Sequence, residues 1–233
     1  MFFDIGRDGL RKMRLPRSFI RGADPILKKS SGFSPIKKTH IGMVLQNALA
    51  FAKTLTRKVV RSGDVVVDAT VGNGHDTSFL AEMVGDEGQV FGFDVQERAI
   101  AATRDRLKAA GYSKRTTLFK RSHAELIDAL PERFIGEIKA VMFNLGYLPG
   151  ADKSIITQKG STLSGLRAAL DVMSPGGLLT VVLYTGHPGG KEEAEAVEAW
   201  AISLDPKRYH AMAYRFLNQP NDPPWLISVE KRG

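Results

Sequence analysis

The segment VVVDATVGNGHDTSFLAEMV, residues 65–84, constrains the fold of this 233-residue chain more than any other part of it. A run of β-branched residues comes first, a turn with two glycines follows, and a helical period resumes after the turn. A strand that passes through a glycine turn into a helix is the first unit of a doubly wound α/β sheet, in which ligands bind at the carboxyl ends of the strands. The segment therefore predicts a ligand site at the end of its strand.

Alternating strand-like and helix-like segments extend this pattern over most of the chain. Helical spacing of apolar residues is found in residues 40–55, 78–84, 97–111, 124–131, 162–173 and 191–204. Strand-like runs occupy residues 64–69, 88–95, 116–122, 138–146, 175–186, 209–218 and 223–232. This alternation predicts an α/β fold with a mostly parallel sheet and helices on both faces. The last two strands are joined by a short link without a helix, so we expect them to be antiparallel.

The glycine turn and the end of the following strand indicate a nucleoside ligand. Gly72 and Gly74 allow the backbone to approach a ligand, and the helix after them presents free amide donors. Asp94 ends the next strand, roughly twenty residues further on, where a carboxylate accepts hydrogen bonds from both ribose hydroxyls. Gln96 stands beside it. A tight turn that merely needs glycine, with Asp76 as a helix cap, is the alternative, and Asp94 in register makes it the weaker one.

The charges around the turn favour S-adenosylmethionine over a dinucleotide. A dinucleotide site has the pattern Gly-x-Gly-x-x-Gly, and the sequence GNGHDT at residues 72–77 lacks the third glycine. Asp68 before the turn and Asp76 after it would repel a pyrophosphate, whereas they suit the ammonium group of a methionine moiety. An NAD-dependent oxidoreductase is therefore less favoured.

After the third strand, Ser122 and His123 occupy a position that suits contact with an adenine ring. His123 suits a helix cap equally well, and both interpretations stay open. The predicted cofactor-binding residues are Asp68, Thr70, Gly72, Asn73, Gly74, Asp76, Thr77, Asp94, Gln96, Ser122, His123 and Asn144.

The fourth strand ends in FNLGYLPGADKS, at the position that faces the transferable methyl group in such folds. Asn144-Leu145-Gly146-Tyr147 resembles the Asn/Asp-Pro-Pro-Tyr motif of amino-group methyltransferases, with Leu145 and Gly146 in place of the two prolines. In that motif an amide oxygen accepts hydrogen bonds from an NH2 group while an aromatic ring stacks on its base. An amine must be unprotonated to attack, so catalysis is then mainly alignment. Asn144 and Tyr147 are the predicted acceptor residues.

Two further residues are candidates for handling the proton of the amine. Asp152 lies in the same loop, and His187 in YTGHPGG follows the fifth strand. Loop capping by Asp152 and simple exposure of His187 are equally open interpretations. Tyr184 is expected in the core or in the pocket wall.

Composition excludes several other kinds of site. Cysteine is absent, which excludes disulfides, thiolate metal sites and cysteine nucleophiles. The five histidines show no paired ligand spacing, so we predict no structural metal. No apolar stretch approaches the about 20 residues that cross a bilayer, and the start of the chain lacks a secretory signal. We therefore expect a soluble, cytoplasmic protein without a membrane partner.

Positive charge is concentrated at the N-terminus. The formal net charge is +8, and residues 1–40 hold ten Lys or Arg against three Asp. We therefore divide the chain into a basic N-terminal arm, residues 1–39, and a methyltransferase domain, residues 40–233. Such an arm suits a polyanion such as RNA, and a solvated leader or an organelle-targeting remnant is the alternative.

Four segments together resemble the YtqB/MnmM family of methyltransferases, also labelled rRNA methylases: residues 68–96, 143–170, 176–200 and 214–231. The string NLGYLPGADK is the most diagnostic, and the resemblance covers about residues 40–231, leaving the basic arm outside it. The resemblance implies a Rossmann-like, class I S-adenosylmethionine-dependent methyltransferase fold, with a seven-stranded, mostly parallel sheet and an antiparallel final strand. It also implies methylation of the 5-aminomethyl group of wobble uridine in tRNA, giving 5-methylaminomethyl-2-thiouridine. The expected partner is tRNA, bound at its anticodon region, with a homodimer as one option for assembly.

Other functions stay open at this point. Methylation of another RNA, including rRNA, is the alternative of the same class, because the fold and the cofactor turn do not name the acceptor. A non-catalytic basic RNA-binding module that retains a nucleoside pocket is the alternative of another class. Methyl transfer to tRNA would distinguish them.

Overall fold

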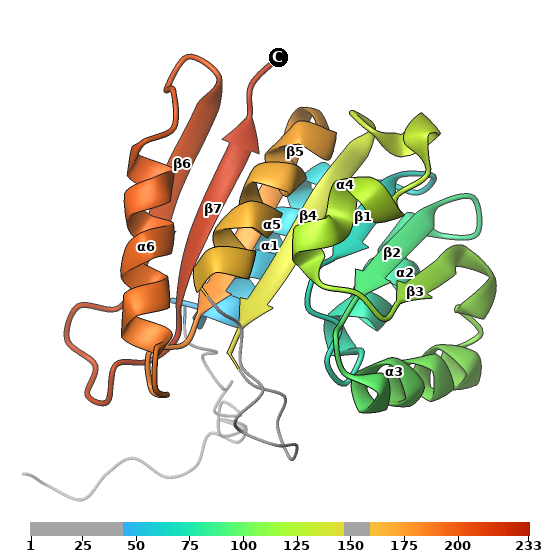
Figure 1. The fold of residues 1–233 in the computed structure, drawn as a ribbon, viewed down its shortest axis with the longest axis horizontal. Helices are drawn as coiled ribbons and strands as arrows, with labels where there is room; N and C mark the ends of the chain where they lie inside the picture. The colour runs from blue at the N-terminus through green and yellow to red at the C-terminus, as the bar shows by residue number, and fades with distance from the viewer. Residues whose placement is uncertain (1–43, 147–158) are drawn as a thin grey trace, which may run out of the picture. The chain divides into compact units, whose positions relative to one another are not determined.

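The computed structural model describes residues 44–146 and 159–233, and a seven-stranded sheet runs through them (Figure 1). Its strand order is β3-β2-β1-β4-β5-β7-β6. The strands are β1 (Val65–Asp68), β2 (Gln89–Phe93), β3 (Thr116–Phe119), β4 (Ile138–Leu145), β5 (Met173–Leu183), β6 (Tyr209–Tyr214) and β7 (Trp225–Lys231). The basic arm predicted at residues 1–39 lies outside the described residues.

The strand directions agree with the prediction. β1 is parallel to β2 and β4, β3 is parallel to β2, and β5 is parallel to β4. β7 is antiparallel to both of its neighbours, β5 and β6. The link 215–224 between β6 and β7 contains no helix, so the chain can only return in the opposite direction. The predicted mostly parallel sheet with an antiparallel final strand is confirmed.

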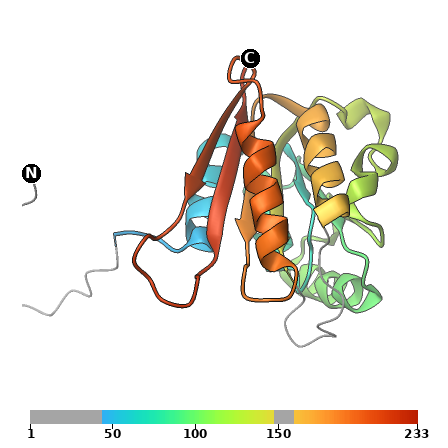
Figure 2. The same cartoon turned by 60° about the vertical axis from the view of Figure 1, so that its left-hand side comes forward.

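Helices cover both faces of the sheet (Figures 1 and 2). One face carries α1 (Ala48–Val59), α2 (His75–Val84) and α3 (Glu97–Ala110). The other face carries α4 (Leu126–Ala129), α5 (Lys159–Val172) and α6 (Gly190–Ile202). Single 3-10 turns occur at Ser113–Arg115, His123–Glu125 and Glu132–Phe134. Within the described part of the chain, no helix is long and apolar enough to cross a membrane.

Each face of the sheet has its own apolar core because successive strand side chains point to opposite sides. Val66 and Ala140 pack under α1 and α2, whereas Val67 and Val141 pack under the helices of the other face. All four are at most 1% exposed. Strands that are buried on both faces have nearly continuous apolar sequences, which is why the central strands are legible in the sequence.

The first helix begins later than predicted. Apolar spacing placed its start before Val44, but the helix begins at Ala48, and the four residues before it are not helical. The Asn47 side chain accepts a hydrogen bond from the Ala50 N–H at 2.9 Å and caps the helix. Val44 and Leu45 are 87% and 60% exposed, so their spacing does not reflect burial. The earlier start was wrong because a local cap outweighed the apolar period.

Candidate functional site

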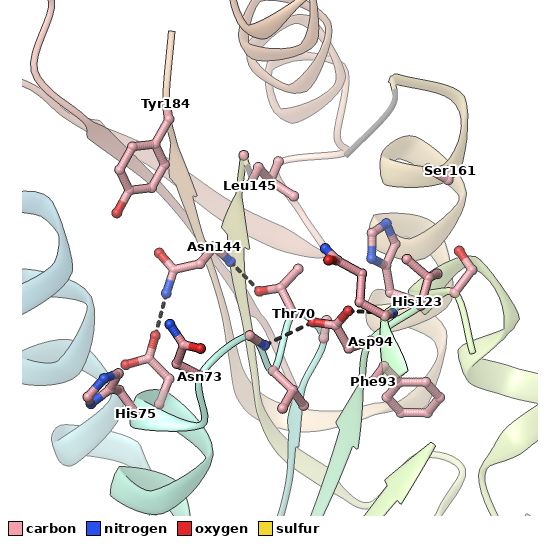
Figure 3. A pocket seen from close by; sticks show the side chains of 18 of the residues that line it. Thr70, Asn73, His75, Phe93, Asp94, His123, Asn144, Leu145, Ser161 and Tyr184 are labelled. Atoms are coloured by element: carbon pink, nitrogen blue, oxygen red, sulfur yellow. Dashed lines mark hydrogen bonds between the residues drawn. The ribbon is translucent and has the colours of Figure 1, made fainter. Parts of the chain in front are cut away.

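A cavity of about 480 Å³ lies at the carboxyl ends of the central strands (Figure 3). The strand order reverses between β1 and β4, so the connections leave toward opposite faces and open a crevice there. The cavity wall includes nine residues predicted from the sequence: Thr70, Gly72, Asn73, Asp76, Asp94, Gln96, Ser122, His123 and Asn144. Tyr184, expected in the core or pocket wall, also lines the cavity.

The glycine turn is held from outside by α3. Gly72 and Gly74 have left-handed backbones, with φ of 52° and 76°. The Thr103 hydroxyl donates to the Gly72 carbonyl at 3.1 Å, and Arg106 Nε donates to the Asn73 carbonyl at 2.8 Å. The turn is therefore fixed before any ligand enters. The sequence pattern does not predict a role for these two helix residues, although a polar Thr103 on the apolar face of a predicted helix is the available signal.

Asp94 joins the end of β2 to the glycine turn. Its carboxylate accepts hydrogen bonds from the Gly72 N–H and the Gln96 N–H, both at 2.9 Å. Burial raises the pKa of Asp94, and the backbone hydrogen bonds oppose that rise. Each carboxylate oxygen has a further lone pair. Asp94 can therefore accept hydrogen bonds from the hydroxyl groups of a ligand while it also holds the glycine turn.

Asp68 lies beneath the cavity and is not part of its wall. It is 1% exposed and accepts hydrogen bonds from the Thr77 hydroxyl at 2.6 Å and the Thr70 N–H at 3.2 Å. Burial, followed by the charge of Asp76, raises the pKa of Asp68 to about 7. The contacts tie β1 to the first turn of α2. Gly74 and Thr77 likewise support the wall without lining it.

Ser122 and His123 have different roles at the 3-10 turn His123–Glu125, which precedes α4. The Ser122 hydroxyl accepts from the Ala124 N–H at 3.2 Å, and its own N–H donates to Glu125 Oε1 at 3.3 Å. Ser122, not His123, is therefore the cap. His123 is 8% exposed, and its Nε2 has no hydrogen-bond partner. A buried polar atom on the wall of a cavity that has no protein partner is satisfied by a bound water or by a ligand.

Burial keeps the His123 ring neutral. It lowers the pKa of His123 to about 4, while a hydrogen bond with the Ala69 backbone acts in the opposite direction. The ring packs edge-on against Phe143, with centroids 5.3 Å apart. One nitrogen of a neutral imidazole is a donor and the other an acceptor, so the side chain can recognise a polar ring without bringing charge.

Asn144 ends β4 with its amide oriented by two neighbours (Figure 3). Its backbone N–H donates to the Thr70 hydroxyl at 2.7 Å, and its Nδ2 donates to Asp76. Asp76 in turn forms an ion pair with Lys53 Nζ at 2.7 Å. Asn144 Oδ1 is buried and has no partner. The amide therefore presents a vacant acceptor at the cavity wall.

Of the other three residues predicted to bind the amine or to take up its proton, the structure describes only His187. Tyr147 and Asp152 lie outside the described residues. His187 does not line the cavity; its Nδ1 lies 3.0 Å from the Pro188 carbonyl, and its ring borders Gly146 and Gly190. Burial, followed by the charge of Asp76, raises the pKa of Tyr184. In the ranges 44–146 and 159–233, no group of three or more His, Asp or Glu side chains is placed to hold a metal ion.

Comparison with known proteins identifies the family. The sequence model of the family described as "Putative rRNA methylase" matches residues 90–230. The chain belongs to this family. A chloroplastic tRNA (mnm(5)s(2)U34)-methyltransferase from Arabidopsis thaliana is 40% identical to this chain, and the match covers 80% of this chain and 70% of the relative.

Two solved structures resemble this chain over nearly all of their own length. A "putative rRNA-methylase" from Clostridium thermocellum is 41% identical with a TM-score of 0.78, covering 81% of this chain and 100% of that one. A "putative methyltransferase" from Streptococcus mutans in complex with SAH is 34% identical with a TM-score of 0.73, covering 80% and 99%. The predicted class I methyltransferase fold is therefore confirmed.

Gly74→Ala should destabilise the protein more than Gly111→Ala. Both glycines have nearly the same left-handed backbone, with φ of 76° and 78°. Both variants therefore carry a similar strain of about 1–2 kcal/mol. An added Cβ would lie 2.6 Å from Thr103 Oγ1 at position 74, whereas nothing lies within 4 Å at position 111. Urea denaturation should show an additional loss of about 1–3 kcal/mol for Gly74→Ala. Equal losses in the two variants would contradict the close packing of α3 on the turn.

Acidification should destabilise the wild type relative to a His123→Gln variant. The pKa of His123 is lower in the folded chain than in the unfolded one, so the unfolded chain binds the proton first. The free energy of unfolding should fall between pH 6.5 and pH 4, by about 3 kcal/mol in the difference between the two proteins. Urea denaturation over this pH range measures it.

The comparison between the two proteins is needed because Asp68 acts in the opposite direction. Its pKa is higher in the folded chain than in the unfolded one, so its protonation stabilises the folded chain as the pH falls below about 7. Both proteins retain Asp68, and its contribution cancels in the difference. Parallel pH curves for the two proteins would show that His123 is not held neutral by the fold.

Proposed function

We propose that this protein is an S-adenosylmethionine-dependent methyltransferase that methylates the aminomethyl nitrogen of wobble uridine 34 in tRNA, giving 5-methylaminomethyl-2-thiouridine. The observation that carries the proposal is the vacant Oδ1 of Asn144, held by the Asp76 contact at the end of β4. The Arabidopsis relative is named for this product, which supports the choice of acceptor.

The cavity fits S-adenosylmethionine at three places. Asp94 has lone pairs for ribose hydroxyls, and the backbone of Gly72 is open to a ligand beside it. His123 Nε2 offers an unused polar contact beside Ser122 and Gln96, where an adenine ring would lie. Asn73 and Asp76 line the opposite end, which suits a methionine moiety. The Streptococcus mutans structure contains SAH, the demethylated form of this cofactor.

The chain's own residues account for alignment of the acceptor. S-adenosylmethionine, when bound, supplies a methyl group activated by a positively charged sulfur. Asn144 Oδ1 can accept a hydrogen bond from an N–H of the acceptor amine, which leaves the nitrogen lone pair free. Tyr184 contributes an aromatic wall beside it. Stacking by Tyr147 and proton uptake by Asp152 or His187 are parts of the same proposal.

The proposal also sets the partner. Position 34 belongs to the anticodon, so the anticodon region of tRNA would meet the mouth of the cavity, and the basic arm at residues 1–39 would contact tRNA phosphates. A homodimer and a cytoplasmic location stay predictions. Methylation of rRNA is the second candidate, because the description of the matching family names rRNA.

One experiment separates these functions. Total tRNA that carries 5-aminomethyl-2-thiouridine, and rRNA from the same cells, should be incubated with the protein and methyl-labelled S-adenosylmethionine. Mass spectrometry of the nucleosides should place the label on the aminomethyl nitrogen of tRNA. Label in rRNA alone would favour the second candidate, and binding of RNA without any transfer would favour a non-catalytic module.

Two substitutions should separate cofactor binding from transfer. Asp94→Ala should weaken SAH binding about 10- to 100-fold, because charge-assisted hydrogen bonds to the ribose are lost. Asn144→Ala should leave SAH binding unchanged and slow single-turnover methyl transfer at least about tenfold, because the amine loses its alignment. Calorimetric titration and rapid quench measure the two effects. Unchanged SAH affinity for Asp94→Ala, or a parental transfer rate for Asn144→Ala, would remove that residue from its role.

A further inference from the structure

Lys53 reaches the cavity from α1, outside every segment that identifies the cofactor site. Its Nζ lies 2.7 Å from Asp76 Oδ1, and the two side chains are 27% and 12% exposed. The ammonium also lies 5.1 Å from the centre of the Phe79 ring, which holds the long side chain on the wall. The ion pair is therefore fixed and largely shielded from water.

Asp76 links this ion pair to the acceptor site. One of its oxygens accepts a hydrogen bond from Asn144 Nδ2, and the other forms the ion pair with Lys53 Nζ. The charge of Asp76 reaches further than its contacts, because it also raises the pKa of Tyr184 and of Asp68 after the effect of burial. Any amine bound at Asn144 Oδ1 would lie within the range of this charge.

An unpaired carboxylate at this place would work against methyl transfer to an amine. A negative charge within a few ångströms favours the protonated form of an amine and raises its pKa by about 1–3 units. A protonated amine has no lone pair to donate. The Asp76 carboxylate is needed as the hydrogen-bond acceptor that orients the Asn144 amide. Methyl transfer to a neutral amine requires that the negative charge of Asp76 be balanced.

We propose that Lys53 is a positioning residue that balances the charge of Asp76, so that the acceptor site beside Asn144 takes the neutral form of a primary amine. This inference rests on the proposed function, since it concerns the acceptor of that reaction. The class of ligand is an uncharged aminomethyl group on a pyrimidine.

The other charged groups around this site do not replace Lys53. Among the described residues of the cavity wall, Arg121 is the other one with a permanent positive charge, and it stands beside Ser122 after β3. On α2, His75 lies against Arg106, 3.4 Å from its guanidinium. From β5, Tyr184 faces the site, and His187 borders Gly146 behind it. Beneath and across the cavity are the two carboxyl groups of Asp68 and Asp94.

The test is the pH dependence of single-turnover methyl transfer to tRNA with 5-aminomethyl-2-thiouridine. For Lys53→Met the acidic limb of the rate profile should move up by about one pH unit. Transfer should then be about tenfold slower below the limb and equal to wild type above it. Lys53→Arg keeps the charge and should restore the wild-type limb.

Arg57→Met is the matched control. Arg57 lies one turn along α1, over the same Phe79 ring at 4.7 Å, and is exposed outside the cavity wall. Arg57→Met removes the same charge from the same helix, so its pH profile of methyl transfer should coincide with that of wild type. SAH affinity should be unchanged in Lys53→Arg and Arg57→Met, which keep a positive charge beside Asp76 and leave the ribose contacts of Asp94 untouched. Transfer by Lys53→Met is measured at saturating S-adenosylmethionine, because Asp76 also borders the methionine end of the cavity.

A binding measurement without transfer gives a second readout. In the presence of SAH, wild type should bind aminomethyl tRNA more tightly as the amine loses its proton, whereas Lys53→Met should lose this gain. A tRNA without the aminomethyl group should show no such difference. Coincident limbs for Lys53→Met and wild type, slower transfer at every pH without a shift, or an equal shift in Arg57→Met would overturn the proposal. Absence of labelled 5-methylaminomethyl-2-thiouridine with wild type would instead reject the proposed function.

Discussion

Parallel pairing of β1 with both β2 and β4 is the constraint on which the site depends. It brings the ends of three strands to one edge, although they lie far apart in the sequence. The Gly72 N–H thereby reaches Asp94, 22 residues further on, and the Asn144 N–H reaches Thr70 across 74 residues. Both hydrogen bonds join a strand end to its neighbour. The cofactor side and the acceptor side of the cavity are therefore fixed by the same sheet edge.

Sequence predicted the parts of the site that follow strands, including Asp76 in the first turn of α2, and it missed the parts that come from α1 and α3. Asp94 and Asn144 could be found because a buried strand has a legible end, and the end of a parallel strand is a ligand position. Lys53, Thr103 and Arg106 could not be placed, because the rotation of α1 and α3 against the turn depends on packing between distant segments. The start of α1 was missed for a different reason, since one local hydrogen bond at Asn47 decided it.

Hydrogen bonding separates supporting residues from residues that await a ligand. Asp68 was predicted in the cofactor set, but its oxygens are already engaged by Thr77 and Thr70 beneath the cavity. Asn144 Oδ1 and His123 Nε2 are buried with no partner. A buried polar atom without a partner costs about 1–3 kcal/mol, and binding of a complementary ligand recovers that cost. The sequence shows only residue types, and it cannot distinguish these two states.

The three carboxyl groups at this edge also differ in charge, and this changes the electrostatic argument for the cofactor. Asp68, with a pKa raised to about 7, is largely neutral in mildly acidic solution and repels an anion less than its residue type suggests. Asp76 is balanced by Lys53, and Asp94 receives two backbone N–H groups. A pyrophosphate would therefore meet weaker repulsion than the bare count of acidic residues implies. Asp94 offers only acceptors and so selects ribose hydroxyls, which a dinucleotide and S-adenosylmethionine share. The missing third glycine in residues 72–77 therefore separates the two cofactors better than the acidic residues do, and SAH in the Streptococcus mutans relative agrees with that choice.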